Sequence, residues 1–564
     1  MTRVTQDLVG ELDKASGRFE RPAGGRMEAV EIVGAENPFE DAAAIRGVGA
    51  GAGVSGAFSC ETFASAGSLQ YTHEDASGFL SYLAKFNPNN FWYKDGNVQP
   101  WAYHEQYDDW QDTYGMDAVC AIYHSGHGGM ANDGNFLAPL GAGWGGMAPQ
   151  AWSFDMRLGN ERARYVFWST CLSCRVTGGH NPHRSWAPAN LGFRMLFGYE
   201  TVSWDNPNYG SAFWKHWNQN KSFSTAWMDA SWYDVAHDQA PSVAAWGASA
   251  AEAQNRVFNE RFFNTGQVAR NYYWWRVYWA ASSAMARRSP NLTIPSSIQA
   301  AQLEQPSVSA AYVENILSRH DVPVSGDLRA VQLGSGTGFR AGGDDVSVAV
   351  EPDGSYEIKF ADPNRDNDDQ IPARQAIGAA RDFARRHGLD EHELTFDRML
   401  LKVDGGGSDE GDGERFEPRV TETVVQFTQV IDGIPVLGPG PGQVSVSLDN
   451  DGTVTGIRNA SRGIAELVDR STVHPPTPGG GDQSGSDEPD FDRILADGWG
   501  DVLRMWLVRG REVPVAFADV PGSAEVGYVV RDSEAVLVAR KDVEVDFGNG
   551  LFKRYRVERP VAGG

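Results

Sequence analysis

Two short apolar runs, each followed at once by polar residues and glycines or cysteines, constrain the fold of this chain most strongly. The first run, 118–123, continues into HSGHGG, and the second, 165–168, continues into STCLSC. Short apolar runs between turn residues are typical of strands buried on both faces of a sheet. About three dozen residues separate the runs, which is enough for the crossover that joins parallel neighbours. The pattern predicts two adjacent parallel strands.

The residues after the runs carry a common chemistry. In an open parallel sheet, sites form beyond the carboxyl ends of the strands, so we expect His127 and Cys171 to meet there. A thiolate is a strong nucleophile, and a nearby imidazole can accept its proton and later protonate a leaving amine. Glycine beside the histidine lets a backbone N–H approach a developing oxyanion. The pattern therefore predicts an acyl-transfer site.

Both blocks resemble those of the caspase-like cysteine peptidases, the clan of caspases, metacaspases, gingipains, separases and CHAT peptidases. The segment 123–128, YHSGHG, is similar to the metacaspase-type histidine block. The segment 167–173, FWSTCLS, is similar to the cysteine block of CHAT peptidases. The resemblance covers residues 60–285. It continues through 193–204 and 211–217, which resemble the helix, glycine turn, Trp-ended strand and helix that follow the cysteine in such domains.

This resemblance implies an α/β three-layer sandwich around a mostly parallel sheet, and a cysteine endopeptidase that acts on proteins or peptides without a cofactor. It implies His127 as general base and acid, Cys171 as nucleophile and Gly128 as an oxyanion donor. Metacaspases carry an aspartate two residues before the nucleophile, where this chain has Ser169. Preference for a basic substrate side chain gains no support from that position. Asp133 and Asp205 are the nearby acids that can select a substrate charge.

Two other interpretations of the same cysteines stay open. His124, His127, Cys171 and Cys174 form H-x2-H and C-x2-C pairs, a ligand spacing that suits a tetrahedral zinc ion. In that case the protein is a non-catalytic interaction protein with a structural zinc site. Cys171 and Cys174 can also form a redox pair, although the expected helix start is missing. Cys60 and Cys120 have no partner block, and we assign them to core packing.

The C-terminal half has a different pattern. The segment 371–387 is amphipathic and ends at Gly388, which predicts a helix with a glycine cap. Strands are expected at 396–403, 420–430, 443–448 and 453–458, with turns at Asp432-Gly433 and Asp451-Gly452. A helix on an antiparallel sheet is an α+β arrangement. The text of 425–457 resembles the PepSY and FTP propeptide modules of secreted metallopeptidases, which implies an intramolecular domain that regulates or inhibits the peptidase.

Turn-rich and low-complexity stretches suggest the domain boundaries. We expect an acidic leader, a Trp-rich catalytic domain, a linker, a PepSY-like domain, a flexible linker and a small antiparallel β domain, at 1–54, 55–290, 291–309, 310–470, 471–490 and 491–564. The tail alternates apolar and polar residues, as strands do.

Tryptophans gather between residues 92 and 279. They suit stacking on sugars, but an aromatic core is the preferred interpretation, with 271–279 typical of a buried helix.

Charge excludes some partners. The net charge is −25, which is unfavourable for binding to nucleic acid or to an anionic lipid surface. By segment it is −3 for residues 1–50, −3 for 51–300 and −19 for 301–564, so the candidate catalytic domain is nearly balanced. There is no run of 18 apolar residues and no signal-peptide core at the N-terminus. As given, the chain is expected to be cytoplasmic, or secreted if a leader has been removed.

Overall fold

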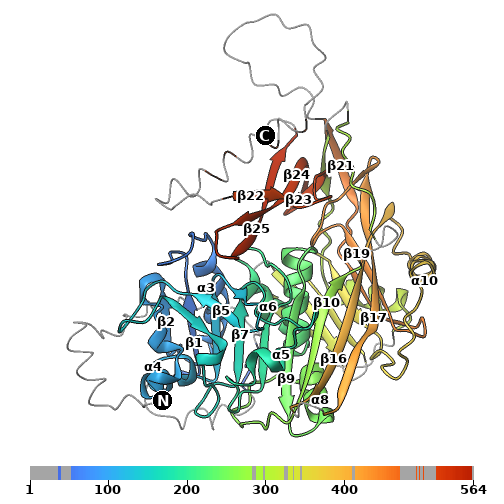
Figure 1. The fold of residues 1–564 in the computed structure, drawn as a ribbon. Coiled ribbons are helices and arrows are strands. Elements are labelled where there is room, and N and C mark those ends of the chain that lie inside the picture. Colours follow the sequence, from blue (N-terminus) through green and yellow to red (C-terminus); the bar gives the residue numbers. More distant parts are fainter. Residues whose placement is uncertain are drawn as a thin grey trace, which may run out of the picture.

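The computed structural model describes residues 36–39, 53–281, 287–295, 299–322, 328–333, 336–342, 346–409, 413–469 and 516–561, and residues 491, 495, 500 and 503 singly. Most of the predicted leader and the whole predicted linker at 471–490 lie outside the described residues. The protein is a mixed α/β structure built on one large mixed sheet (Figure 1). In the described part of the chain, no helix is long and apolar enough to cross a membrane.

One half of the large sheet begins with parallel strands. In spatial order they are β2 (Phe91–Lys94), β1 (Ser55–Ser59), β3 (Ala121–Ser125), β7 (Tyr165–Ser169) and β8 (Met195–Tyr199). Then come β9 (Pro241–Gly247) and β10 (Tyr272–Ala280), each antiparallel to the strand before it. β1, β3, β7, β8 and β9 are buried at every position, as expected for strands covered on both faces.

The predicted parallel pairing of the two apolar runs is confirmed. β3 and β7 lie side by side with Ser125 opposite Ser169, so both strands end at the same edge of the sheet. β3 starts three residues later than the predicted strand because residues 116–118 form a short 3-10 helix. The carboxylate of Asp117 holds that turn by accepting backbone N–H groups of Gly159 and Arg162, at 2.9 Å each.

Helices and a small sheet cover the two faces of these strands. One face carries α3 (Thr72–Leu83), α6 (Tyr209–Trp217), α7 (Phe223–Asp229), a π-helix (Ala230–Val235) and α8 (Ala250–Asn259). The other face carries α4 (Asp108–Tyr114), α5 (Pro182–Trp186) and the sheet of β4 (Gly129–Met130), β5 (Phe136–Pro139) and β6 (Gln150–Trp152). The fully buried indoles are Trp168, Trp186, Trp214, Trp217, Trp227, Trp232 and Trp246. The preferred interpretation of an aromatic core is confirmed.

The large sheet does not stop at the predicted domain boundary. β10 pairs along its whole length with β16 (Leu394–Ser408). Beyond β16 come β17 (Arg415–Ile431), β19 (Gln443–Leu448), β20 (Val454–Asn459), β15 (Tyr356–Lys359), β14 (Ser347–Val350), β13 (Gly336–Gly342) and β12 (Arg329–Leu333), with β18 (Ile434–Pro435) on β17. The segment 271–279 was expected to be helical and is a central strand instead. Its backbone is paired on both sides, and its apolar side chains pack into the cores on both faces of the sheet.

The elements predicted for the second half are confirmed. α10 (Ala373–Arg386) is followed by Gly388, whose φ of +61° is the left-handed conformation expected after a helix end. Its buried face packs on β17 and β19. β16, β17, β19 and β20 occupy the four predicted strand positions. A further helix, α9 (Ala310–Arg319), packs into the same core.

A second sheet joins the tail to distant parts of the chain. It contains β21 (Ile464–Asp469), β11 (Gln299–Leu303), β24 (Glu534–Asp546), β22 (Ala516–Asp519), β23 (Glu525–Arg531) and β25 (Phe552–Pro560). The tail is antiparallel, as predicted. The segment 291–309 was expected to be a linker, but it contains the strand β11, which is paired with β21 and β24. Strands this short take their stability from partners distant in the sequence, so local text does not reveal them.

Candidate active site

His127 lies in the loop after β3 and is fully buried. Its Nε2 is 2.9 Å from the carbonyl oxygen of Gly67. The ring packs between Phe63 and Phe547, with ring centroids 4.8 and 4.7 Å away. Its Nδ1 has no hydrogen-bond partner within the described residues.

These contacts determine the tautomer and the protonation state of the His127 imidazole. A carbonyl oxygen can only accept, so Nε2 carries the proton and donates it to Gly67, and Nδ1 keeps a free lone pair. Burial first, and the positive charge of Lys553 second, lower the pKa of His127 to about 3. The ring is therefore neutral at pH 7 and has one nitrogen able to accept a proton.

Cys171 follows β7 and is 1% exposed. Its thiol donates to the carbonyl oxygen of Phe552 at 3.0 Å, and the backbone N–H of Ser203 donates to its sulfur at 3.2 Å. The next residue, Leu172, has a φ of +58°. Left-handed backbone at a non-glycine residue costs energy and is often found at functional sites. The sulfur thus sits at a strained turn, between the backbone and hydroxyl of Ser203 and the carbonyl of Phe552.

Gly128 brings the two strand ends together. A Cβ at this position would lie 2.6 Å from the carbonyl oxygen of Cys171 and 2.9 Å from the Cβ of Thr170. Only glycine fits so close an approach. The segments carrying the predicted dyad therefore touch. Within the described residues the two side chains do not hydrogen-bond each other, because Cys171 is engaged by Phe552 and Ser203 and His127 by Gly67.

The three residues considered for substrate binding, Ser169, Asp205 and Asp133, lie in different surroundings. Ser169 is buried on β7 and faces the carboxylate of Asp75. Asp205 is buried two residues after Ser203, and its carboxylate accepts from the backbone of Gln70 at 2.7 Å. Asp133 is exposed in a turn, where its carboxylate accepts the next-but-one backbone N–H at 3.0 Å. Of the two acids considered for substrate charge, only Asp205 adjoins the segment that contacts the nucleophile.

Sequence reasoning missed Asp75. Its buried carboxylate accepts the hydroxyls of Tyr123 and Ser125, at 2.7 Å each, and the backbone N–H of Gly210 at 2.9 Å. Burial raises the pKa of Asp75, and these donors oppose the rise. The residue ties β3 to α3 and α6 beneath the candidate site. Its position in an amphipathic helix gave no sign of this role.

The zinc arrangement does not assemble. Among the described residues, the only three His, Cys or acidic side chains whose ligand atoms lie within 4.8 Å of one another are His216, Asp229 and Glu357. That group already surrounds the ammonium of Lys221, which donates to Asp229 and Glu357 at 2.7 Å each. A cation is therefore supplied by the chain itself.

The four residues of the suggested zinc set have other partners. His124 Nδ1 is 2.8 Å from the hydroxyl of Tyr103, and Cys174 lies against Gly198 in the core. All four cysteines are free thiols. Cys60 and Cys120 belong to the apolar cores, as predicted, and burial raises the pKa of both.

The tail places residues at the candidate active site that the sequence did not predict. The hairpin of β24 and β25 lies against the edge where β3 and β7 end (Figure 1). It places Phe547 on His127 and Phe552 on Cys171. Lys553 is 2% exposed and donates to the hydroxyl of Ser203 at 3.0 Å. The alternating tail sequence predicted an antiparallel sheet, but nothing local indicated a contact 381 residues away.

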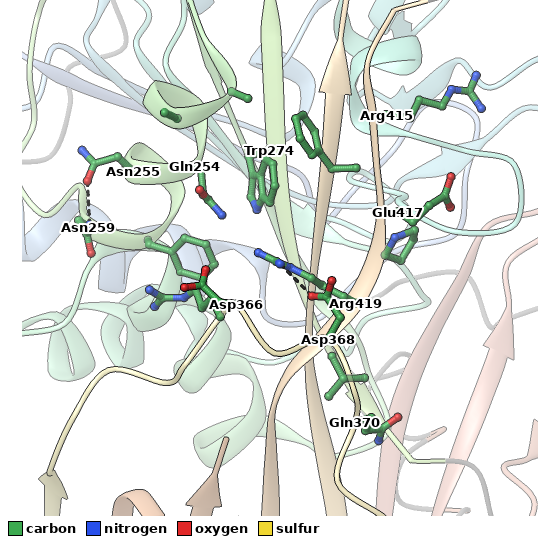
Figure 2. A pocket seen from close by; sticks show the side chains of 17 residues that line it. Gln254, Asn255, Asn259, Trp274, Asp366, Asp368, Gln370, Arg415, Glu417 and Arg419 are labelled. Atoms are coloured by element: carbon green, nitrogen blue, oxygen red, sulfur yellow. Dashed lines mark hydrogen bonds and ion pairs between the residues drawn. The ribbon is translucent and has the colours of Figure 1, made fainter. Parts of the chain in front are cut away.

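A separate groove of about 1040 Å³ lies between α8, the segment 365–370 and the start of β17 (Figure 2). Its lining includes Trp274, Phe258 and charges of both signs, some of them paired, as Arg419 is with Asp368 at 2.9 Å. No nucleophile or histidine lines it. The groove is thus distinct from the candidate active site.

The fold and site together define a mixed α/β protein with a buried Cys–His pair at the carboxyl edge of its parallel strands. Residues 56–282 match a family model described as "Domain of unknown function (DUF6345)". The match spans β1 to β10 and includes both His127 and Cys171. No curated protein matches the chain.

Proposed function

We propose that residues 55–290 are a cysteine endopeptidase of caspase-like arrangement, with Cys171 as nucleophile and His127 as general base. The observation that carries the proposal is the close contact at Gly128, which joins the ends of two parallel strands, one leading to an imidazole and the other to a thiol. The free lone pair on Nδ1 of His127 and the turn at Leu172 support it further.

The proposed reaction uses the side chains of His127 and Cys171 and the backbone of Gly128. Nδ1 of His127 takes the thiol proton while the sulfur of Cys171 attacks the substrate carbonyl carbon. The negative charge that develops on the carbonyl oxygen is stabilised by the N–H of Gly128. The C–N bond then breaks, and the imidazolium returns its proton to the leaving amine. Water, deprotonated by the same nitrogen, hydrolyses the thioester and restores the thiol.

Two features favour these roles. The amide of Ser203 donates to the sulfur of Cys171 and orients it. The carbonyl of Gly67 fixes the orientation of the imidazole and would share the positive charge formed when Nδ1 is protonated. Neither contact depends on a third acidic side chain.

We further propose that the PepSY-like region at 310–470 regulates the site indirectly. Within the described residues, its strands make no hydrogen bond to His127 or Cys171. It supports the tail sheet instead, through the backbone hydrogen bond of 2.7 Å from Leu437 to Tyr528 and through the pairing of β21 with β11. Its proposed role is to position the tail.

The test is hydrolysis of a peptide library by the full chain. Because the site is covered, each variant also carries Lys553→Glu, which places a carboxylate next to Asp205. Cys171→Ala is expected to lower the rate at least about a thousandfold, and His127→Ala by about 10²–10⁴-fold. Cys120→Ala removes a buried thiol outside the site and is expected to keep activity. Undiminished hydrolysis by Cys171→Ala, with Cys120→Ala equally active, would overturn the proposal.

A further inference from the structure

The turn of the β24–β25 hairpin fits a recess beside His127. Phe547 stands edge-on to the imidazole. A Cβ at Gly67 would lie 2.5 Å from Cδ1 of Phe547. Gly67 therefore leaves room for this phenyl ring, and its carbonyl holds the histidine at the same time. The hairpin and the base are fitted to each other.

Phe552 places its backbone carbonyl against the sulfur of Cys171. The oxygen of Phe552 accepts the thiol hydrogen of Cys171 at 3.0 Å. A substrate carbonyl must come within about 3–3.5 Å of the attacking atom. The backbone of β25 thus occupies the space that a scissile peptide would need.

β25 also pairs as an added strand. Arg554 forms a parallel bridge with Trp204, donating its N–H to Ser203 and accepting from Asp205, at 3.3 Å each. Backbone pairing of this kind is a common way to bind an extended peptide at an open edge. The segment 203–205 follows β8, the neighbour of the strand β7 that leads to Cys171. It therefore lies where it can guide a peptide past the sulfur.

Four successive side chains of β25 secure the strand. The ammonium of Lys553 is buried on the hydroxyl of Ser203 and the carbonyl of Trp204. The other anchors are Arg554 on Asp238 at 3.0 Å, Tyr555 on Asp205 at 2.8 Å and the Arg556 guanidinium 4.8 Å from the Trp204 ring. A buried charge with specific acceptors favours one register over a loose contact.

We propose that residues 547–556 are a built-in occupant of the candidate peptide cleft and keep Cys171 closed to solvent until the hairpin is displaced. That this occupation inhibits a peptidase rests on the proposed function, whereas the occupation itself does not. The occupant is this segment of the chain, and any competitor for the cleft would be an extended, basic peptide.

The electrostatics agree with this role. β25 has four basic residues and one acidic residue in an acidic half of the chain. Its Lys553 charge opposes protonation of His127, in addition to burial. Removal of the strand would expose the imidazole and take away that charge, so the base would recover its ordinary proton affinity. The same movement would open the nucleophile and restore its partner.

The experiment measures alkylation of Cys171 by iodoacetamide, followed by peptide mass spectrometry, in the native full-length chain. Lys553→Glu and Phe547→Ala are each expected to speed labelling about tenfold or more, because each removes a buried anchor of the strand. Lys541→Glu and Phe517→Ala alter the same sheet away from the cleft and are the matched controls. A synthetic peptide of residues 549–558 is expected to slow labelling of Lys553→Glu again.

Peptide hydrolysis is measured in parallel to separate the two proposals. Faster labelling without hydrolysis would support the occupant and count against the peptidase. Hydrolysis by the unaltered chain, with labelling unchanged in both cleft variants, would overturn the occupant and leave the peptidase standing. Equal acceleration in cleft and control variants would indicate general unfolding of the tail, and would also overturn the proposal.

Discussion

Residues 121–205 and residues 546–556 both line the candidate site, but they reach it in different ways. The first group ends a set of parallel strands, so its positions follow from short-range order and one crossover between neighbours. The second group arrives on a hairpin held by β24 and by distant partners. The candidate catalytic residues therefore lie at the sheet edge, and the tail covers them. The two can be altered separately.

Gly128→Ala should sharpen this comparison with the largest effect, because it acts on the sheet edge alone. The added methyl group meets the backbone carbonyl of Cys171, which cannot move aside easily. We expect hydrolysis to fall at least about a hundredfold and stability to drop by about 1–3 kcal/mol. Peptidase assays and urea unfolding measure both.

Gly129→Ala is the matched control. At this adjacent position the nearest atom to an added Cβ is Cδ2 of Leu551, at 3.6 Å, which is an ordinary contact. We expect near-normal activity and stability. If the two alanine variants behaved alike, the close approach at Gly128 would not matter for the site.

A second prediction concerns how His124 and His127, which are both buried, make the stability depend on pH. Burial, with the charge of Lys553 as a second cause, lowers the pKa of both His124 and His127 to about 3. In the unfolded chain an imidazole binds its proton near pH 6.5. Between these values the unfolded state holds more protons, so stability is complete above about pH 6.5 and is lost as the pH falls towards 3.

The expected loss between pH 7 and pH 5 is about 2 kcal/mol for each histidine. Urea unfolding at the two pH values should show a loss that is smaller by about 2 kcal/mol in His127→Gln. His392→Gln, outside the parallel sheet, should keep the full dependence. An unchanged pH dependence in His127→Gln would mean that this imidazole is solvated, and would break the contrast between a sealed edge and its cover.

The smallest expected effect is that of a chelator. The ligand atoms of the suggested zinc set do not gather, and the one described His–acid group is filled by the ammonium of Lys221. We expect EDTA to leave the melting temperature and the labelling rate of Cys171 unchanged. A drop in melting temperature that added zinc reverses would restore the zinc interpretation.

Several elements could be predicted because their cause is local. The apolar runs at β3 and β7 are long enough to be strands and too short to be helices, and each is bounded by turn residues. α10 has a clear 3.6-residue pattern and a glycine at its end. The residues His127, Gly128 and Cys171 were found by the same logic, since each follows such a strand.

Other elements could not be predicted because their cause is distant. β11 has little apolar sequence of its own and exists through pairing with β21 and β24. β10 looked like a buried helix because strands on both of its sides and layers on both faces demand apolar residues at every position. Likewise, the carboxylate of Asp75 has meaning only once three elements converge on it.

The sequence by itself determined the two parallel strands, the residues that follow them and the aromatic core around them, because hydrophobic period and turn residues act over a few positions. Only the tertiary structure decided that the sheet continues into the second half and that a basic hairpin closes the site. These outcomes depend on backbone pairing and buried charge contacts between segments hundreds of residues apart. Such pairing leaves no mark in the local order of residues.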